Sequence, residues 1–410
     1  MTTKVLQSSQ KKIPKIRFPE FSAVWEHRRM NELMVESKKR NSDLKYGKDK
    51  VLSVSGEFGI VNQVKHLGRS YAGESVHNYH VVDVGDVVYT KSPLKANPYG
   101  IIKVNKGESG IVSTLYAVYK VKGESADGSF LDYYFSLDEN VNRYLRPLVK
   151  KGAKNDMKIN NAYVLHDKIY VTSIAEQRQI ASFFSIIDTY INELKKAKSL
   201  LEQYKKGVVQ KIFSQEMRFK NREGEKFSKW EEKPLGELFN EMTERNEDNN
   251  FELLSVTLKG GVCKQGTSAK RDSSSADKSN YKVVRVGEIA YNTMRMWQGA
   301  SGISKLEGII SPAYTVVALK RGDVNFYGYL LKHPRVLFDF YRYSQGMTSD
   351  TWNLKFKHFS EVIVSVPTDL DEQKLIANFI GSIDDLIQAK EEQINLAGQW
   401  RKGLLQEMFI

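Results

Sequence analysis

The segment EQRQIASFFSIIDTYI begins at Glu176, and the segment EQKLIANFIGSIDDLI begins at Glu372, 196 positions later. Eight of the sixteen aligned positions are identical. Apolar residues then recur every seven positions, as Ile180, Ile187 and Leu194 do in the first copy. Sustained heptads of this kind predict long helices that pack against other helices. The chain of 410 residues therefore carries the same long helix twice.

The repetition extends into the regions that precede the two helices. Segments that start at Val51, Asn78, Gly110 and Tyr204 return at Leu253, Asn280, Gly308 and Trp400. In both halves β-branched and aromatic runs bounded by Gly predict strands, and short helices are expected over 131–145 and 326–343. A period of about 200 residues is too long for a solenoid repeat. The sequence predicts an α+β fold, in which two similar mixed α/β domains are joined by two long helices in a pseudo-twofold internal repeat.

The natural partner of each long helix is the other helix. Residues 176–213 carry a net charge of +3 and residues 372–409 carry −2, and opposite signs favour pairing of the two copies. At 1.5 Å per residue each helix would be roughly 57 Å long. An antiparallel coiled coil would close the structure with one domain near each end. The alternative is that each helix folds back onto its own domain as a separate hairpin.

This organisation predicts four segments along the chain. They are a first domain at 1–175, a first helix at 176–215, a second domain at 216–371 and a second helix at 372–410. Four charged residues interrupt the apolar columns of the helices, and we expect them to face a partner protein: Lys198, Lys205, Lys390 and Arg401.

The composition of the chain favours a nucleic-acid-binding protein and argues against a disulfide-bonded, metal-binding or membrane-spanning one. The net charge of +13 and the pI near 9.3 indicate a polyanionic partner, most often nucleic acid. The single cysteine, Cys263, excludes an internal disulfide, and the histidines show no metal-binding spacing. The first residues lack the apolar core of a signal peptide, and no apolar run is long enough to cross a membrane. We expect a soluble cytoplasmic protein.

The loops that follow the matched strands are the candidate DNA-binding segments. Arg, Asn and Gln can bond base edges, whereas Lys, Ser and Thr suit phosphates. The candidates in the first half are Lys65, Arg69, Lys91, Ser92, Lys95, Asn97, Tyr99, Lys151, Lys154, Asn155 and Lys158. Those in the second half are Lys264, Gln265, Arg271, Asn292, Thr293, Arg295, Trp297, Gln345, Thr348, Ser349, Trp352, Asn353 and Lys355. The strands match while these loops diverge, as expected of two domains that recognise different sequences. The alternative for each residue alone is a solvated surface loop.

No motif for catalysis stands out. Asn97-Pro98-Tyr99 lacks one proline of the turn used by amino-methyltransferases, and no GxxxxGK[ST] nucleotide-binding loop occurs. The acids at the start of each long helix, such as Glu176 and Asp371, are expected to cap free N–H groups and oppose the helix dipole. The chain is therefore predicted to hold no catalytic residue, no metal and no cofactor.

The chain resembles the specificity subunit of type I restriction-modification systems over nearly its whole length. The residues that carry the resemblance are Glu176-Gln177 with Ile180-Ala181, Glu372-Gln373 with Ile376-Ala377, the ends KKGVVQKIF and RKGLLQEMF, and Trp25 and Trp230. The resemblance implies that each domain is a target recognition domain for one half of a split double-stranded DNA sequence, and that the helices set the gap. It further implies two modification subunits, which carry S-adenosylmethionine and methylate adenine N6, and two restriction subunits, which use ATP and Mg²⁺.

A third apolar stripe on the helices would remain exposed in a two-helix coil and is expected to bind the partner subunits. Its members are Phe183, Tyr190, Tyr204, Phe379 and Trp400. Two other functions remain open at this point. The chain could be a stand-alone DNA-binding regulator or architectural protein, or an enzyme in its own right.

Overall fold

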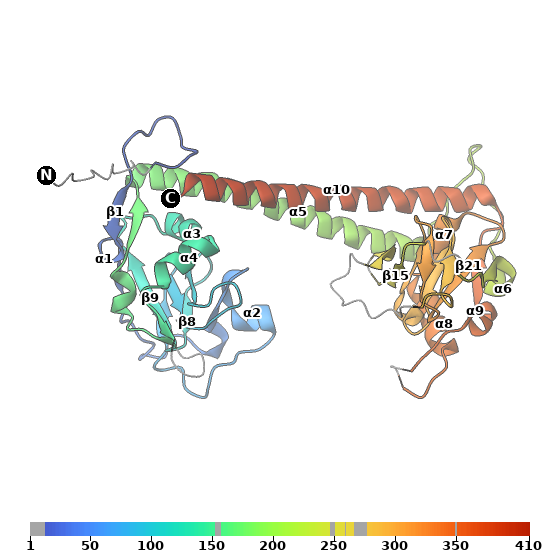
Figure 1. The fold of residues 1–410 in the computed structure, drawn as a ribbon, viewed down its shortest axis with the longest axis horizontal. Helices are drawn as coiled ribbons and strands as arrows, with labels where there is room; N and C mark the ends of the chain where they lie inside the picture. The colour runs from blue at the N-terminus through green and yellow to red at the C-terminus, as the bar shows by residue number, and fades with distance from the viewer. Residues whose placement is uncertain (1–12, 152–156, 247–250, 259, 266–276, 349–350) are drawn as a thin grey trace. The chain divides into compact units, whose positions relative to one another are not determined.

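The computed structural model describes residues 13–151, 157–246, 251–258, 260–265, 277–348 and 351–410 (Figure 1). The chain divides into two compact units. Unit 1 comprises Met1–Lys195 with Glu392–Ile410, and unit 2 comprises Lys196–Glu391. Each unit therefore contains one mixed domain and a part of both long helices, α5 (Ile174–Phe213) and α10 (Leu370–Met408). Within the described residues no helix combines the length and hydropathy needed to cross a bilayer.

The domain of unit 1 is built around a four-stranded antiparallel sheet. Its order is β2 (Met34–Glu36), β9 (Tyr116–Val121), β6 (Val87–Thr90) and β7 (Ile101–Val104). Paired strands complete the domain: β1 (Glu26–Arg29) with β12 (Lys168–Val171), β3 (Leu52–Ser55) with β4 (Gly59–Asn62), β5 (His80–Val82) with β8 (Gly110–Val112), and β10 (Lys150–Lys151) with β11 (Met157–Lys158). Its helices are α1 (Met30–Leu33), α2 (Gln63–Leu67), α3 (Gly128–Ser136) and α4 (Asp138–Leu145).

The domain of unit 2 repeats this topology. Its four-stranded sheet has the order β14 (Phe239–Met242), β21 (Tyr314–Leu319), β18 (Ile289–Asn292) and β19 (Ser301–Ile303). The accompanying pairs are β13 (Glu231–Pro234) with β22 (Ile363–Val366), β15 (Leu254–Thr257) with β16 (Gly261–Lys264), and β17 (Lys282–Val284) with β20 (Gly308–Ile310). Its helices are α6 (Leu235–Leu238), α7 (Val324–Leu330), α8 (Pro334–Tyr343) and α9 (Phe356–Glu361).

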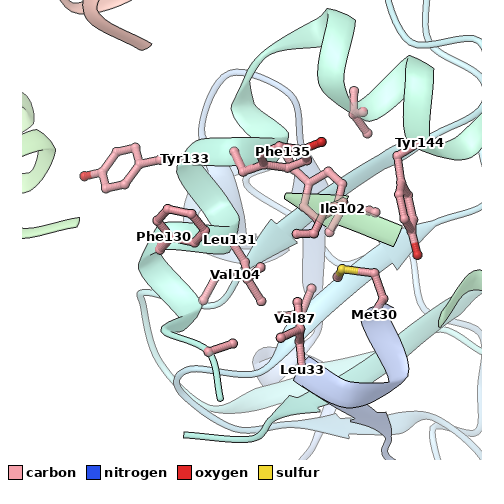
Figure 2. Close-up of a cluster of buried hydrophobic side chains, with 14 of the residues drawn as sticks. Met30, Leu33, Val87, Ile102, Val104, Phe130, Leu131, Tyr133, Phe135 and Tyr144 are labelled. Carbon is pink, nitrogen blue, oxygen red and sulfur yellow. The ribbon is translucent and has the colours of Figure 1, made fainter. Parts of the chain in front are cut away.

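In each unit, apolar residues from the sheet, the short helices and the long helices form a large core cluster, with smaller buried clusters beside it. In unit 1 the buried Val87 and Ile102 of the sheet belong to the same cluster as Phe130 and Leu131 of α3 (Figure 2). The same cluster includes Phe184 of α5. Burial of such side chains is favourable by roughly 1.5–3 kcal/mol each. The long helices are thus integral to the cores of the units.

The two long helices pack against each other in opposite directions. In unit 1 Phe184, in the N-terminal part of α5, contacts Phe409 beyond the end of α10, with ring centroids 6.2 Å apart. In unit 2 Ile212, near the end of α5, shares a buried cluster with Ile376, near the start of α10. The predicted antiparallel pairing is therefore confirmed, and the alternative of two separate hairpins is wrong.

The Glu-Gln pair that opens the repeated segment fixes each helix to its own domain. Glu176 is buried and accepts hydrogen bonds from Arg17 at 2.7 and 2.6 Å. The buried Gln177 accepts the backbone N–H of Asp127, the N-cap of α3, at 2.9 Å. In the second copy Arg218 donates to Glu372, and Gln373 accepts the N–H of Asp323, the N-cap of α7. The repeated Glu-Gln sequence therefore makes the same contacts at the start of both long helices, and we call this set of contacts the joint.

The contacts of Glu176 in this joint differ from the role that the sequence predicted for it. Glu176 was expected to cap free N–H groups at the start of the helix, but Ser173 Oγ accepts the Glu176 N–H instead. The Glu176 carboxylate accepts from Arg17 and from the Thr172 hydroxyl. The partner Arg17 lies in the segment before the first strand, so no local motif marks it.

Three of the four charged residues in the helix columns face the opposite long helix, which corrects the expectation that they face a partner. Arg401 pairs with Asp188 in unit 1, and Lys205 pairs with Asp384 in unit 2. In addition, Lys198 pairs with Glu391 in unit 2.

Each unit also ties its domain helix to both long helices through a tyrosine. Tyr133 of α3 donates to Asp188 at 2.9 Å, and Arg401 pairs with the same carboxylate. Tyr329 of α7 donates to Asp384 at 2.8 Å, and Lys205 pairs with that carboxylate at 2.6 Å. Because the helices run in opposite directions, the carboxylate comes from α5 in unit 1 and from α10 in unit 2.

Candidate nucleic-acid interface

The loop after β6 carries five of the candidates in unit 1. Ser92 and Lys95 are exposed, and Lys91 is partly exposed, with its pKa lowered by burial. Asn97 is buried, and its amide donates to Asp138 of α4 at 2.7 Å, so it holds the loop in place. Tyr99 packs against the core, and its carbonyl accepts from the Tyr89 hydroxyl. The lysines and Ser92 are the side chains of this loop that can reach a ligand.

A hairpin of unit 1 carries two further candidates and meets that loop. Lys151 pairs through its backbone with Met157 in the β10–β11 ladder, and Lys158 belongs to the same ladder. Tyr89 connects the two segments, because its hydroxyl lies 3.9 Å from Met157 Sδ and donates to the Tyr99 carbonyl. Two further candidates, Lys154 and Asn155, lie outside the described residues.

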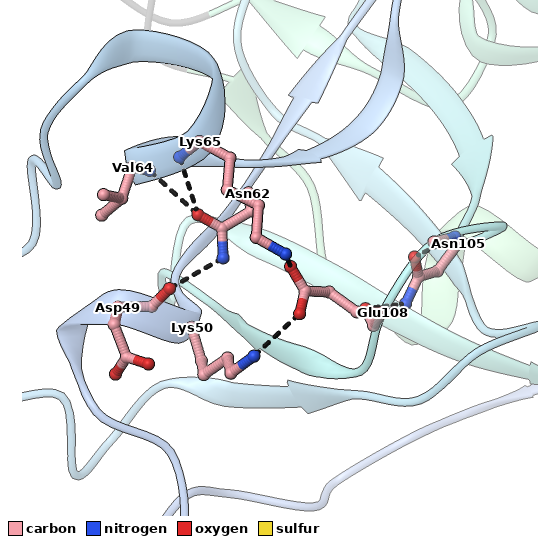
Figure 3. Close-up of polar contacts among 8 residues, drawn as sticks. Asp49, Lys50, Asn62, Val64, Lys65, Asn105 and Glu108 are labelled. Atoms are coloured by element: carbon pink, nitrogen blue, oxygen red, sulfur yellow. Dashed lines mark hydrogen bonds and ion pairs between the residues drawn. The ribbon is translucent and has the colours of Figure 1, made fainter.

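Two further candidates of unit 1 lie in and just after helix α2. Lys65 belongs to an ion-pair network, whereas Arg69 is exposed. Glu108 accepts from Lys50 at 2.8 Å and from Lys65 at 2.7 Å (Figure 3). These two ammonium groups lower the pKa of the Glu108 carboxyl to about 2. Asn62 caps α2 by accepting the N–H groups of Val64 and Lys65. Lys65 is therefore a cation that already has a carboxylate partner, whereas Arg69 lies over the Tyr71 ring.

The corresponding set in unit 2 lies on the β15–β16 hairpin. Lys264 is exposed and pairs with Glu252 at 2.9 Å, and Gln265 follows it with partial exposure. The third candidate of this set, Arg271, lies outside the described residues.

The loop after β18 in unit 2 presents an arginine and an indole. Arg295 is exposed, with its guanidinium 3.2 Å from Gln298 Oε1. Trp297 is partly exposed, and its Nε1 donates to the Met294 carbonyl. Thr293 is buried and donates to Ala313, so it supports the loop, and Asn292 Oδ1 accepts the Met294 N–H.

The second candidate loop of unit 2 lies beside the first. Gln345 and Asn353 exchange backbone hydrogen bonds of 3.0 and 2.8 Å, and the Leu354 N–H donates to the Thr293 carbonyl. Trp352 packs edge-on against Trp297, with ring centroids 5.2 Å apart. Among the candidates Gln345, Thr348 and Lys355 are exposed, and Trp352 and Asn353 are partly exposed. Ser349 lies outside the described residues.

The predicted partner stripe is exposed in part. Tyr190, Tyr204 and Trp400 are each 54% exposed. Phe183 is partly buried and packs against Phe18, and Phe379 packs against Phe219. Further large apolar side chains on the long helices are exposed beside them: Ile186, Leu200, Leu386 and Leu396.

Two solved structures share this arrangement over nearly the whole chain. One is the crystal structure of a type I restriction-modification system S subunit from M. genitalium, with a TM-score of 0.58, 14% identity, and coverage of 97% of this chain and 99% of that chain. The other comes from work on complex assembly and conformational transition of the type I R-M system, with a TM-score of 0.53, 15% identity, and coverage of 94% and 97%. The chain has the fold of a type I S subunit. No protein-family model matches it.

The S-subunit fold brings together residues that were not candidates from the sequence. Tyr341 of α8 packs against Trp352 with ring centroids 4.8 Å apart, and Phe338 lies beside Tyr341. Both are exposed, and so is Met347 in the adjoining loop. The signal was available in the run FDFYRY, whose aromatics at 338 and 341 fall on one helical face, while Phe340 is buried.

The described residues contain no group of three or more His, Cys, Asp and Glu side chains placed to hold a metal ion. Among the described residues, the exposed polar side chains of these loops are hydrogen-bond donors, acceptors and cations, which suit the binding of a polyanion.

Proposed function

We propose that this chain is the DNA sequence-specificity subunit of a type I restriction-modification complex, and that each unit recognises one half of a bipartite target. The observation that carries the proposal is the combination of a repeated framework with diverging loops. The sheet order and the Glu-Gln joint are the same in both units. At the same place after the matched strand, however, unit 1 presents Lys91 and Lys95, whereas unit 2 presents Arg295 and Trp297.

Sequence recognition in this proposal combines base readout with neutralisation of phosphates. Arg295 and Gln345 in unit 2 have the donors needed to bond base edges in the major groove. Exposed lysines such as Lys95 and Lys355 suit phosphates, which position the protein without reading sequence. Binding should therefore weaken as salt rises.

Two matching surfaces support a scaffolding role. In unit 1 Tyr190 and Trp400 are exposed on the long helices, and in unit 2 Leu386 and Tyr204 occupy the equivalent positions, 196 residues away in the sequence. Exposed aromatic and aliphatic anchors of this kind are typical of protein interfaces. A repeated surface suits two copies of one partner, and we assign it to two modification subunits.

The chemistry of the complex then belongs to the partners. S-adenosylmethionine would be bound by the modification subunits, and ATP and Mg²⁺ by two restriction subunits. The modification subunit would rotate the target adenine out of the stack to methylate it, at a cost of a few kcal/mol. This chain would contribute the choice of sequence and no catalytic group.

Methylation mapping tests the proposal. Genomic N6-methyladenine should disappear from one split sequence when the gene is deleted. Arg295→Ala should relax or weaken recognition of one half-site only, by about 1–3 kcal/mol. Arg222→Ala, an exposed arginine elsewhere in unit 2, is the matched control. Loss of the gene without any change in methylation would contradict the proposal and would favour a stand-alone regulator.

A further inference from the structure

Unit 2 contains an open cleft between its domain and the long helices. Its volume is about 1110 Å³, slightly above the range of about 300–1,000 Å³ typical of small-molecule sites. One wall is formed by α5 and α10, and the other by β16, β19 and α7. Five Lys and Arg residues line it: Lys205, Lys206, Lys305, Lys332 and Arg335.

The repeat shows which residues occupy the equivalent place in unit 1. The helices α3 and α7 align through their N-caps, since Asp127 and Asp323 each accept the N–H of a phenylalanine and each donate to the Gln of the joint. Counting from these caps, Asp132 of α3 corresponds to Gly328 of α7. Ser136 corresponds in the same way to Lys332.

The strands align through a second shared contact. The Gly85 N–H donates to the Asn105 carbonyl, and the Gly287 N–H donates to the Ser304 carbonyl. Lys106, one residue after Asn105, therefore corresponds to Lys305.

In unit 1 this place is filled by a charge pair. Lys106 pairs with Asp132 at 2.7 Å, and the other oxygen of Asp132 accepts the Val104 N–H at 3.0 Å. In unit 2 Gly328 supplies no carboxylate at this position, whereas the cation is retained as Lys305, and both residues line the cleft. In the part of the chain that the structure describes, Lys305 makes no ion pair. The lysine at this position is therefore neutralised by a carboxylate in unit 1 (Lys106), whereas in unit 2 (Lys305) it keeps its charge and lines the open cleft.

The balance of charge in the cleft favours an anion. Two of its acids are already engaged, because Asp384 pairs with Lys205 at 2.6 Å and Glu202 pairs with Lys198 at 3.5 Å. Asp385 also lines the α10 wall. The surrounding protein lowers the pKa of the Lys332 ammonium, mainly through burial, with repulsion from Lys205 as a further cause.

Backbone features of the cleft point to phosphate in particular. The cleft includes His333 and Pro334 at the N-terminus of the ten-residue helix α8, and no side chain caps this end. A helix N-terminus attracts phosphate through its free N–H groups and its dipole. Lysines serve as point charges for phosphate, and the three lysines Lys206, Lys305 and Lys332 suit a ligand with several negative charges.

We propose that the cleft of unit 2 binds a small polyphosphate-bearing ligand of nucleotide size. Lys305, Lys332 and the N-terminus of α8 hold its phosphoryl oxygens. Unit 1 lacks such a site because Asp132 occupies the space and neutralises Lys106. Strand β16 lines the cleft and also carries the DNA candidate Lys264, but none of the groups proposed here to hold phosphate is among the side chains assigned to DNA. Binding of a free polyphosphate is therefore a claim beyond the proposed function, and it is tested without DNA.

Calorimetric titration of the full chain with tripolyphosphate at fixed ionic strength tests the site. The wild type should bind one equivalent. Lys332→Ser, which installs the residue that unit 1 has at this position, and Lys305→Gln should each weaken binding about tenfold. Lys106→Gln, the matched change in unit 1, should leave it unchanged. Gly328→Asp, which restores the unit 1 carboxylate, should abolish binding.

A second arm distinguishes a free ligand from the DNA backbone as the source of phosphate. Affinity for a duplex that contains the mapped target should be the same for the wild type, Lys332→Ser and Lys305→Gln. A wild type that binds no tripolyphosphate, or variants that bind it as tightly, would overturn the proposal. Parallel loss of duplex affinity in the two variants would also overturn it and assign the cleft to DNA.

Discussion

At the scale of single residues, the buried ion pair at the start of α5 stands out. Arg17 and Glu176 have side chains that are only 9% and 1% exposed. Their hydrogen bond raises the pKa of the Arg17 guanidinium, so this cation stays charged throughout the working range of pH. Removing one partner of a buried pair leaves an uncompensated charge, which costs roughly 3–5 kcal/mol.

We therefore expect Glu176→Gln to lower the free energy of unfolding of unit 1 by about 3 kcal/mol. Glu407→Gln is the control, since its partner Lys15 is 77% exposed and such surface pairs contribute at most about 1 kcal/mol. Urea denaturation of the two variants gives the comparison. Equal midpoints would show that the joint does not stabilise the helix.

His80 gives unit 1 a dependence of stability on pH. Burial, with Arg40 nearby, lowers its pKa from 6.5 to about 4. At pH 5 the unfolded chain therefore binds a proton that the folded chain does not, so stability falls as pH decreases through this window. The loss should be about 2 kcal/mol between pH 7.5 and pH 5.

His80→Gln should remove this part of the pH dependence, measured as the free energy of unfolding at the two pH values. The same change at the exposed His77 should retain the behaviour of the wild type. A His80→Gln protein with the full pH dependence would rule out His80 as its source.

The sequence could not distinguish the exposed side chains of the candidate loops from the buried ones. Asn97 and Thr293 were candidates for DNA contact, yet both are buried and hold their loops in place. The partner of Asn97 is Asp138, 41 positions away, so no local pattern reveals the contact. In the same way, Glu108 neutralises Lys65 across 43 positions.

At the scale of elements, the heptads predicted both the existence and the pairing of the long helices. The helices begin at Ile174 and Leu370, within two residues of the predicted starts. The sequence did not predict that the charged heptad positions pair within the coil, because that depends on which carboxylates the opposite helix brings near. Asp188 and Asp384 also accept from a domain tyrosine, and this contact requires the folded domain.

Substitution by Ala should change the stability of the protein differently on the two faces of α5. Phe184 is fully buried, and Phe184→Ala should cost about 3–5 kcal/mol of stability. Tyr190, 54% exposed, should tolerate Ala with little loss of stability. On the proposed function, Tyr190→Ala should nevertheless weaken assembly with the modification subunits.

Thermal unfolding and co-purification with the partner subunits measure these two effects separately. A Tyr190→Ala chain that assembles normally would remove Tyr190 from the interface. A Tyr190→Ala chain that unfolds as easily as Phe184→Ala would show that the exposed stripe belongs to the core.

At the scale of the whole molecule, the internal repeat is the feature from which the fold could be predicted. Both sheets have the same strand order, and both joints use a Glu-Gln pair. The structural effect of the residues that differ between the two copies could not be predicted from the sequence. Gly328 stands at the position of Asp132, and only the folded chain brings it into the same cleft as Lys305.

The central claim is that two units recognise two half-sites and that the paired helices set the gap between them. The most direct measurement is methylation mapping after four residues are inserted into each helix, after Lys195 and after Glu391. The insertion lengthens each helix by about 6 Å, which corresponds to at most two base pairs at roughly 3.4 Å each. The account predicts unchanged half-sites with a gap wider by one or two base pairs. Methylated sites whose gap is unchanged would contradict it.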